Sequence, residues 1–180
     1  MVQIQKIAFL SMLNQPSVDL NWLFDGLDDY CIIKIPGDFP YYEKNSDLDI
    51  ICDNKFKFAE ILNRKITDKY NYKTKSYIAA NNNLQLDVII NNALDIKFDL
   101  TDDLTCFSAI PVNIKLADKI LHDKQAHNNT FIPSVEHEFI IRYLEYNEYK
   151  SNPKKIKHLN YIINNGGNID DVLKLIQPYT

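Results

Sequence analysis

An alternation of acidic and apolar residues runs through segment 46–53 (SDLDIICD), and it dictates more about the fold than any other stretch of the chain. Successive side chains of a β-strand point to opposite faces, so Asp47 and Asp49 would share one face and Leu48 and Ile50 the other. Neighbouring carboxylates repel each other, and a raised pKa, exposure to water or a bound divalent cation relieves the repulsion. The segment therefore predicts a strand whose acidic face is a candidate metal site.

A glycine precedes this strand at a position where a turn is expected. Gly37 is the only glycine between Gly26 and Gly166, and it follows the apolar run 30–35. Glycine tolerates a left-handed backbone and lets a ligand approach closely, and successive free amides in a turn can bind phosphate. The region therefore predicts a strand, a glycine turn, a polar loop and the acidic strand in this order. We expect the backbone at Gly37 to bind phosphate.

These residues resemble the motif of the nucleotidyltransferase superfamily that includes DNA polymerase beta and the aminoglycoside nucleotidyltransferases. That motif has an apolar residue, Gly, then Gly or Ser, a spacer, and Asp-apolar-Asp/Glu-apolar. Its second half is matched by Asp47-Leu48-Asp49-Ile50, whereas Asp38 stands after Gly37 where the family usually has Gly or Ser. The resemblance implies a mixed β-sheet core flanked by helices, an NTP as substrate, and Mg²⁺ or Mn²⁺ held by Asp47, Asp49 and a third acid.

The third acid is expected on a hairpin formed by 84–90 and 94–100. Asp87 is the first choice, because an acid inside an apolar strand is costly unless it faces a cation or solvent, and because it matches the position of the family's third acid. Asp99 is the alternative, since hairpin pairing would put it on the same face. The residues alone leave both open.

Several charged residues are candidates for binding the nucleotide. Lys34 and Lys44 flank the polar loop and could meet phosphate oxygens, and Arg142 could do so together with nearby lysines. Solvated lysines, and a helix ion pair of Arg142 with a glutamate, are the alternative interpretations. Asp38 is either part of the nucleotide site or a turn former.

The chain divides into an α/β core over 1–112 and a helical part over 113–180. Besides the strands above, helical spacing or capping residues mark helices at 16–28, 55–69, 114–124, 135–149, 154–164 and 168–176. Residues 70–79 alternate weakly, and residues 2–13 are rich in apolar side chains. The expected fold class is α/β (α+β), with a cleft between the two parts.

Composition limits the classes of function that fit this chain. The 180 residues are 46% hydrophobic and carry a net charge of −4, so one sizeable core is expected and nucleic acid is an unlikely partner. The three cysteines fit no metal spacing and suit a reducing cytoplasm, and no leader pattern or membrane-length apolar run occurs. The sequence lacks the Walker, nucleophile-elbow, Gly-x-Gly-x-x-Gly and zinc-binding motifs. This weakens the hypotheses of a hydrolase, a P-loop protein or a dinucleotide-binding protein.

We therefore expect a cytoplasmic, Mg²⁺-dependent nucleotidyltransferase that moves NMP from an NTP to a hydroxyl or phosphate of a small-molecule acceptor and releases pyrophosphate. The resemblance leaves several acceptors open, because small members of the superfamily modify antibiotics, act in toxin–antitoxin pairs on proteins, or accompany surface-polysaccharide genes. Asp87 would complete the metal site and serve as the base. The alternatives are a catalytically silent nucleotide- or partner-binding module and an ordinary α/β interaction domain. The sequence does not indicate the oligomeric state.

Overall fold

The structure, a computed structural model, describes residues 17–180, so the apolar segment 2–13 lies outside the described residues. The elements in chain order are α2 (Leu20–Phe24), β1 (Tyr30–Ile32), β2 (Ser46–Cys52), α3 (Lys55–Tyr70), β3 (Lys73–Ile78), β4 (Leu84–Ile90), β5 (Ala93–Thr101), α4 (Lys115–His122), β6 (Gln125–His127), β7 (Thr130–Ile132), α5 (Val135–Glu148), the 3-10 turn η1 (Pro153–Lys155), α6 (Ile156–Asn164), α7 (Ile169–Ile176) and the 3-10 turn η2 (Gln177–Tyr179).

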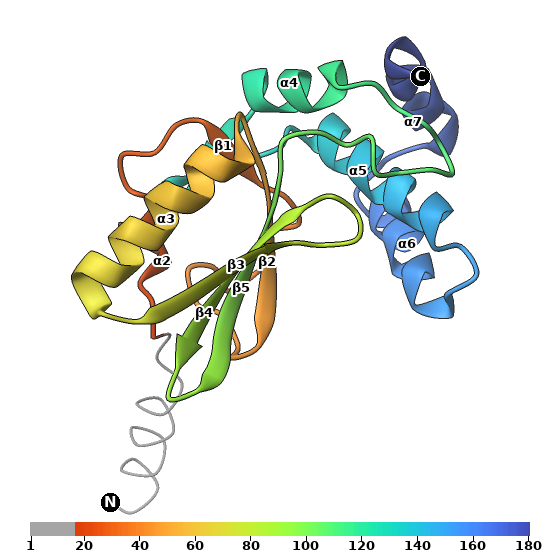
Figure 1. Cartoon of the computed structure of the whole chain (residues 1–180). Coiled ribbons are helices and arrows are strands. Elements are labelled where there is room, and N and C mark those ends of the chain that lie inside the picture. The colour runs from red at the N-terminus through yellow and green to blue at the C-terminus, as the bar shows by residue number, and fades with distance from the viewer. Residues whose placement is uncertain (1–16) are drawn as a thin grey trace, which may run out of the picture.

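A five-stranded mixed sheet forms the centre of the molecule (Figure 1), with the strand order β1-β2-β5-β4-β3. β2 and β5 are parallel, and the other neighbours are antiparallel. A parallel pair needs a crossover, and α3 with β3 and β4 supplies it. The expected α/β (α+β) class with a mixed sheet is confirmed.

Helix α3 covers one face of the sheet. Its buried side chains Phe58, Leu62 and Ile66 pack with the apolar residues that β2 and β5 turn toward it, such as Ile50 and Phe98. The helix starts at Asn54, whose side chain accepts a hydrogen bond from the Lys57 amide, and it ends at Asn71 in a left-handed conformation. The period-two pattern of β2 thus buries Leu48 and Ile50 and leaves its aspartates on the opposite face.

The C-terminal helices form a second core on that opposite face. Ile51 of β2 and Cys31 of β1 pack there with Leu116 of α4 and with Ile141 and Leu144 of α5. Figure 1 shows α5, α6 and α7 gathered on the side of the sheet away from α3. The helices lie close to their predicted ranges.

The C-terminal part also contains a short hairpin, β6–β7, in the stretch between the predicted helices 114–124 and 135–149, where no element was predicted. It packs beside β1, and the Tyr30 hydroxyl lies 2.8 Å from the Thr130 hydroxyl in a buried hydrogen bond. The N-terminal helix is shorter than predicted, because it begins only after Asp19, whose side chain accepts a hydrogen bond from the Trp22 amide. No helix within residues 17–180 is both long and apolar enough to cross a membrane.

The β4–β5 hairpin turns at Asn91 and Asn92, whose φ angles are 52° and 60°. Two consecutive left-handed residues are typical of a tight two-residue hairpin turn. Strand β3, predicted only as a weak alternation, lies outermost in the sheet and exposes most of its side chains, including those of Lys73 and Lys75.

The loop between α6 and α7 has no room for a side chain at Gly167. A Cβ there would lie 2.6 Å from Ile162 Cγ2, 2.6 Å from Phe139 Cε2 and 2.9 Å from the Ile162 carbonyl oxygen. We expect Gly167→Ala to lower the free energy of unfolding by about 1–3 kcal/mol through overpacking. Urea denaturation would measure this change.

Gly37→Ala is the matched control, since a Cβ at Gly37 meets nothing within 4 Å. It should change the free energy of unfolding by less than about 0.5 kcal/mol. Equal losses in the two variants would contradict the packing described for α6 and α7.

Candidate functional site

Three aspartates from two neighbouring strands line one cleft. Asp47 and Asp49 come from β2 and Asp99 from β5, and the parallel register sets Asp49 directly opposite Asp99. The cleft has a volume of about 440 Å³. Its other wall comes from the C-terminal part, which contributes Glu145 and Lys155.

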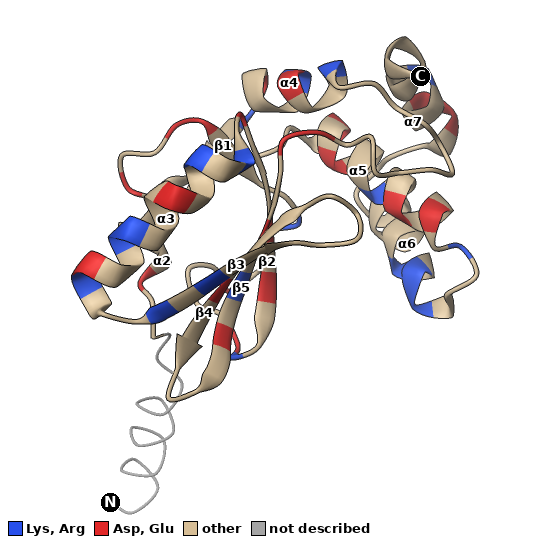
Figure 2. Ribbon diagram, in the orientation of Figure 1, with Lys and Arg blue, Asp and Glu red and all other residues tan. Residues whose placement is uncertain are grey.

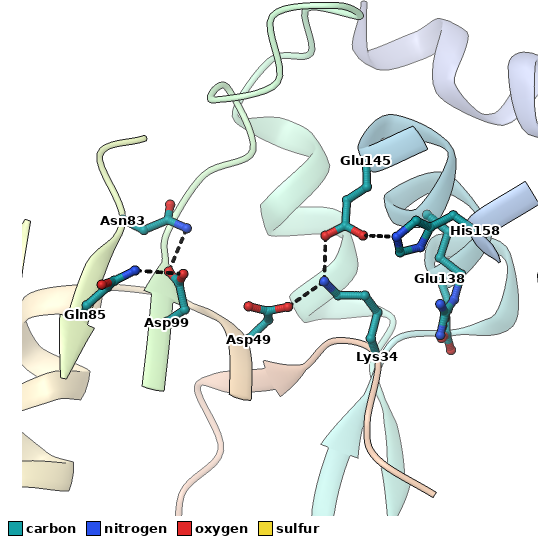
Figure 3. A network of polar contacts seen from close by, with 9 residues as sticks. Lys34, Asp49, Asn83, Gln85, Asp99, Glu138, Glu145 and His158 are labelled. Atoms are coloured by element: carbon teal, nitrogen blue, oxygen red, sulfur yellow. Dashed lines mark hydrogen bonds and ion pairs between the residues drawn. The ribbon is translucent and has the colours of Figure 1, made fainter. Parts of the chain in front are cut away.

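An ammonium group bridges the two walls of this cleft. Lys34 Nζ lies 2.5 Å from Asp49 Oδ2 and 2.6 Å from Glu145 Oε1 (Figure 3). On the far side of Glu145, Oε2 lies 3.2 Å from Nε2 of His158, which is buried on α6. The bridge therefore joins the end of β1, strand β2 and helix α5.

The backbone at Lys34, two residues after the end of β1, has φ 56°, the left-handed conformation. Such a conformation costs a residue with a Cβ roughly 1–2 kcal/mol. A turn is also present at residues 37–40, where the sequence predicted one, but Gly37 does not have a left-handed φ. The turn that shapes the site is thus at Lys34.

Burial and the ammonium act together on the ionisable groups. Burial lowers the pKa of Lys34, but Asp49 and Glu145 outweigh it and raise that pKa above its ordinary value. Burial raises the pKa of Glu145, but Lys34 outweighs it and the pKa is lowered. At Asp49 burial prevails over Lys34, so the pKa of Asp49 is raised. The surroundings therefore disfavour the ionised form of Asp49 and favour that of Glu145.

Asp99 is oriented by two side-chain amides. Asn83 Nδ2 donates to Asp99 Oδ1 at 2.8 Å, and Gln85 Nε2 donates to Asp99 Oδ2 at 3.3 Å (Figure 3). Both donors come from the β3–β4 loop or β4, next to β5 in the sheet. Because amides are neutral, they fix the direction of the carboxylate without neutralising its charge.

Asp87, the first choice for the third acid, lies apart from the cleft. It sits on β4 opposite Lys97 of β5 and Lys75 of β3. Its Oδ1 is buried without a hydrogen-bond partner among the described residues. The structure thus brings Asp47, Asp49 and Asp99 together at the cleft and leaves Asp87 one strand further away.

Four other predicted residues do not line the cleft. Gly37, Asp38 and Lys44 are exposed in the loop before β2. Arg142 forms an ion pair with Glu138 at 2.6 Å and stacks on Tyr161, with its Cζ 3.6 Å from the ring centroid. The geometry at Arg142 matches the alternative interpretation, a helix ion pair.

The sequence reasoning missed several residues of the cleft. Glu145 was considered only as one of the glutamates that could pair with Arg142, whereas in the structure it pairs with Lys34 and lies beside His158. The Asn83 amide and the Tyr149 ring also line the cleft. The only local pattern at Glu145 is a hydrophilic helix face, which does not indicate a role in the cleft. Its contact with Lys34 joins residues 111 positions apart, so residue spacing could not predict it.

The donor atoms fit a hard divalent cation, because Mg²⁺ and Mn²⁺ are bound by carboxylate oxygens. Asp47, Asp49 and Asp99 supply such oxygens on adjacent strands. Across residues 17–180, no three His, Cys, Asp or Glu side chains are grouped closely enough to hold a metal ion as they stand. The cation that Asp49 contacts is the Lys34 ammonium.

A scan of protein-family models and a search of curated proteins find no match to this chain.

His158 makes stability depend on pH. Burial, only partly opposed by Glu145, lowers its pKa from 6.5 to about 4. The unfolded chain therefore binds a proton more readily, so this contribution to stability is present above pH 6.5 and is lost as the pH falls toward 4. In His158→Gln, the free energy of unfolding should fall less over this range, as measured by urea denaturation at a series of pH values.

His127→Gln, which removes an exposed imidazole, is the control and should follow the wild-type pH profile. A profile for His158→Gln that is as steep as that of the wild type would show that other groups cause the loss of stability at low pH.

Proposed function

We propose that this protein is a metal-dependent nucleotidyltransferase that moves NMP from an NTP to a hydroxyl or phosphate of a small-molecule acceptor and releases pyrophosphate. One observation carries the proposal: Asp47 and Asp49 of β2 and Asp99 of the parallel neighbour β5 meet at one cleft. Its volume of about 440 Å³ is within the range of small-ligand pockets.

Asp47, Asp49 and Asp99 would hold Mg²⁺ or Mn²⁺. When bound, the ion would neutralise phosphate charge and favour attack on the α-phosphorus. The geometry favours Asp99 over Asp87 as the third acid, because Asp99 lies opposite Asp49 and lines the cleft. Asp99 is also the better candidate to accept the proton of the acceptor hydroxyl, since two amides already orient its carboxylate.

The remaining walls suit the other parts of a nucleotide. Lys34 and Lys155 carry the positive charges that line the cleft among the described residues, and ammonium groups bind phosphate oxygens. Tyr149 and Phe107 add aromatic surface on which a base could stack. Lys34 lies beside Asp49 of the sheet, whereas Lys155 Nζ lies 5.0 Å from the centroid of the Tyr149 ring. Bound phosphates would therefore extend from the sheet toward the end of α5.

The charge distribution favours a small acceptor over nucleic acid. Figure 2 shows basic and acidic residues interleaved along α3, with further lysines on β3 and near the start of α6. Nucleic-acid binding would require basic residues gathered into a stripe or patch around the site. The net charge is −4. The unpaired state of Cys31, Cys52 and Cys106 supports a reducing compartment such as the cytoplasm.

A second candidate is a catalytically silent nucleotide- or partner-binding module. The observation that favours it is the ion pair between Lys34 and Asp49, which gives one of the metal-binding acids a cation of its own.

Binding and turnover experiments distinguish the two candidates. Each NTP should raise the melting temperature of the wild type in the presence of Mg²⁺, and Asp49→Asn or Asp99→Asn should abolish that shift. We expect both variants to lower pyrophosphate release, measured over a panel of acceptors, by roughly a hundredfold or more, because each replaces a charged carboxylate ligand of the metal with a neutral amide.

Asp87→Asn is the control within the same sheet, and it should keep the Mg²⁺-dependent shift because Asp87 lies outside the cleft. A nucleotide shift that does not need metal, without turnover, would instead support the silent module. If Asp87→Asn but not Asp99→Asn removed the shift, the assignment of the third acid would be reversed.

A further inference from the structure

Lys34 lies between two carboxylates that come from opposite walls of the cleft. Its ammonium contacts Asp49, which is expected to hold metal, and Glu145, which comes from the opposite wall. The side chain of Asp49 is 30% exposed, whereas those of Lys34 and Glu145 are 20% and 13% exposed. Solvent ions therefore reach the Asp49 side of the bridge more easily than the Glu145 side.

Glu145 is the firmer of the two anchors. It lies on α5 next to Leu144, which is 1% exposed in the second core, and its other oxygen is buried beside His158 and accepts no hydrogen bond from residues 17–180. Moving Glu145 would thus disturb packed helices. Releasing Asp49 requires only that the end of the lysine side chain turn.

The charge of the cleft favours an additional cation. The acids that line it are Asp47, Asp49, Asp99 and Glu145, against which stand Lys34 and Lys155, leaving two negative charges in excess. One divalent cation would balance this excess. The same cation must compete with Lys34 for Asp49, because two positive charges on one carboxylate repel each other.

We propose that Lys34 is an internal counter-ion of the site, which competes with the divalent cation for Asp49. When a nucleotide binds, the Lys34 ammonium contacts its phosphates instead of Asp49, and Glu145 keeps the ammonium in the cleft. This inference rests on the proposed function. A lysine suits the role, because its ammonium has three donors on a flexible stem and can keep one partner while exchanging another. Lys34 would then oppose the binding of metal alone and favour the binding of metal together with nucleotide.

The two effects have opposite signs, and one substitution tests both. Lys34→Met should bind Mn²⁺ alone roughly tenfold more tightly or better, because Asp49 is freed from its competitor. The same variant should bind a non-hydrolysable NTP with Mg²⁺ roughly tenfold more weakly, because a phosphate ligand is lost. Electron paramagnetic resonance of free Mn²⁺ measures the first affinity, and isothermal titration calorimetry measures the second.

Lys155→Met is the matched control for the metal, because it removes an equal charge from the same cleft but from a residue without an ion pair among those described. It should change the affinity for Mn²⁺ by less than about threefold, as expected for a more distant charge. A gain equal to that of Lys34→Met would show a general effect of charge and would overturn the specific competition at Asp49.

A substitution on α5 tests whether Glu145 keeps the Lys34 ammonium in the cleft. Glu145→Gln should weaken binding of the nucleotide analogue by roughly tenfold, because Lys34 loses the contact that keeps it in the cleft. Glu138→Gln removes the carboxylate that pairs with Arg142 on the same helix and should leave that affinity unchanged. Equal affinities in wild type and Glu145→Gln would overturn the tethering role.

Removing Lys34 leaves two partly buried carboxylates without their cation, so Lys34→Met could fail to fold. Lys34→Gln, which keeps hydrogen-bond donors but not the charge, is the second variant and should show the same two changes. The wild type supplies an independent measurement. The NMR signal of the Lys34 side chain should shift when Mg²⁺ and the nucleotide analogue are added together, and an unmoved signal would overturn the exchange of partners.

The outcomes separate this inference from the proposed function. If the wild type binds Mg²⁺ with the nucleotide but neither Lys34 variant binds Mn²⁺ more tightly, the inference is overturned and the nucleotidyltransferase proposal stands. If the Lys34 variants bind Mn²⁺ more tightly while no form of the protein binds nucleotide, the competition at Asp49 is supported. The proposed function and the phosphate role of Lys34 then fail.

Discussion

The parallel pairing of β2 with β5 is the constraint on which the site depends. It sets Asp49 beside Asp99, two residues that stand 50 positions apart in the chain. Because parallel neighbours cannot be joined by a tight turn, the chain makes its crossover through α3, β3 and β4 before it returns to β2. Helix α3 buries the apolar face of both strands. The carboxylates are thereby left on the other face, where a ligand can reach them.

The second core sets the distance between the two walls of the cleft. Ile51 of β2 packs with Ile141 and Leu144 of α5, and burial of such side chains contributes roughly 1.5–3 kcal/mol each. The ion pairs of Lys34 are expected to add less net stability, because desolvation offsets much of their attraction. Apolar packing therefore positions α5, and the ionic bridge determines the charge that a ligand meets between α5 and the sheet.

Local patterns predicted most of the elements, because period-two and helical spacing directly reflect which face is buried. They predicted the acidic face of β2, helix α3, the β4–β5 hairpin and the C-terminal helices. They also put Asp87 and Asp99 on one face, but strand order decides which of them adjoins β2. The β6–β7 hairpin was missed although Asn128-Asn129, both left-handed, repeats the Asn-Asn signal of Asn91-Asn92. The contact between Lys34 and Glu145 depends on tertiary packing, so residue spacing could not indicate it.

The outermost position of β3 has a consequence for self-association. β7 flanks the sheet at β1, so a strand from another molecule could extend the sheet through hydrogen bonds most easily alongside β3. Lys73 and Lys75 stand exposed along that strand. In an antiparallel pair of two copies, their ammonium groups would face each other at short range, and like charges in such positions are destabilising. We therefore expect the lysines of β3 to disfavour edge-to-edge pairing between two copies of this sheet.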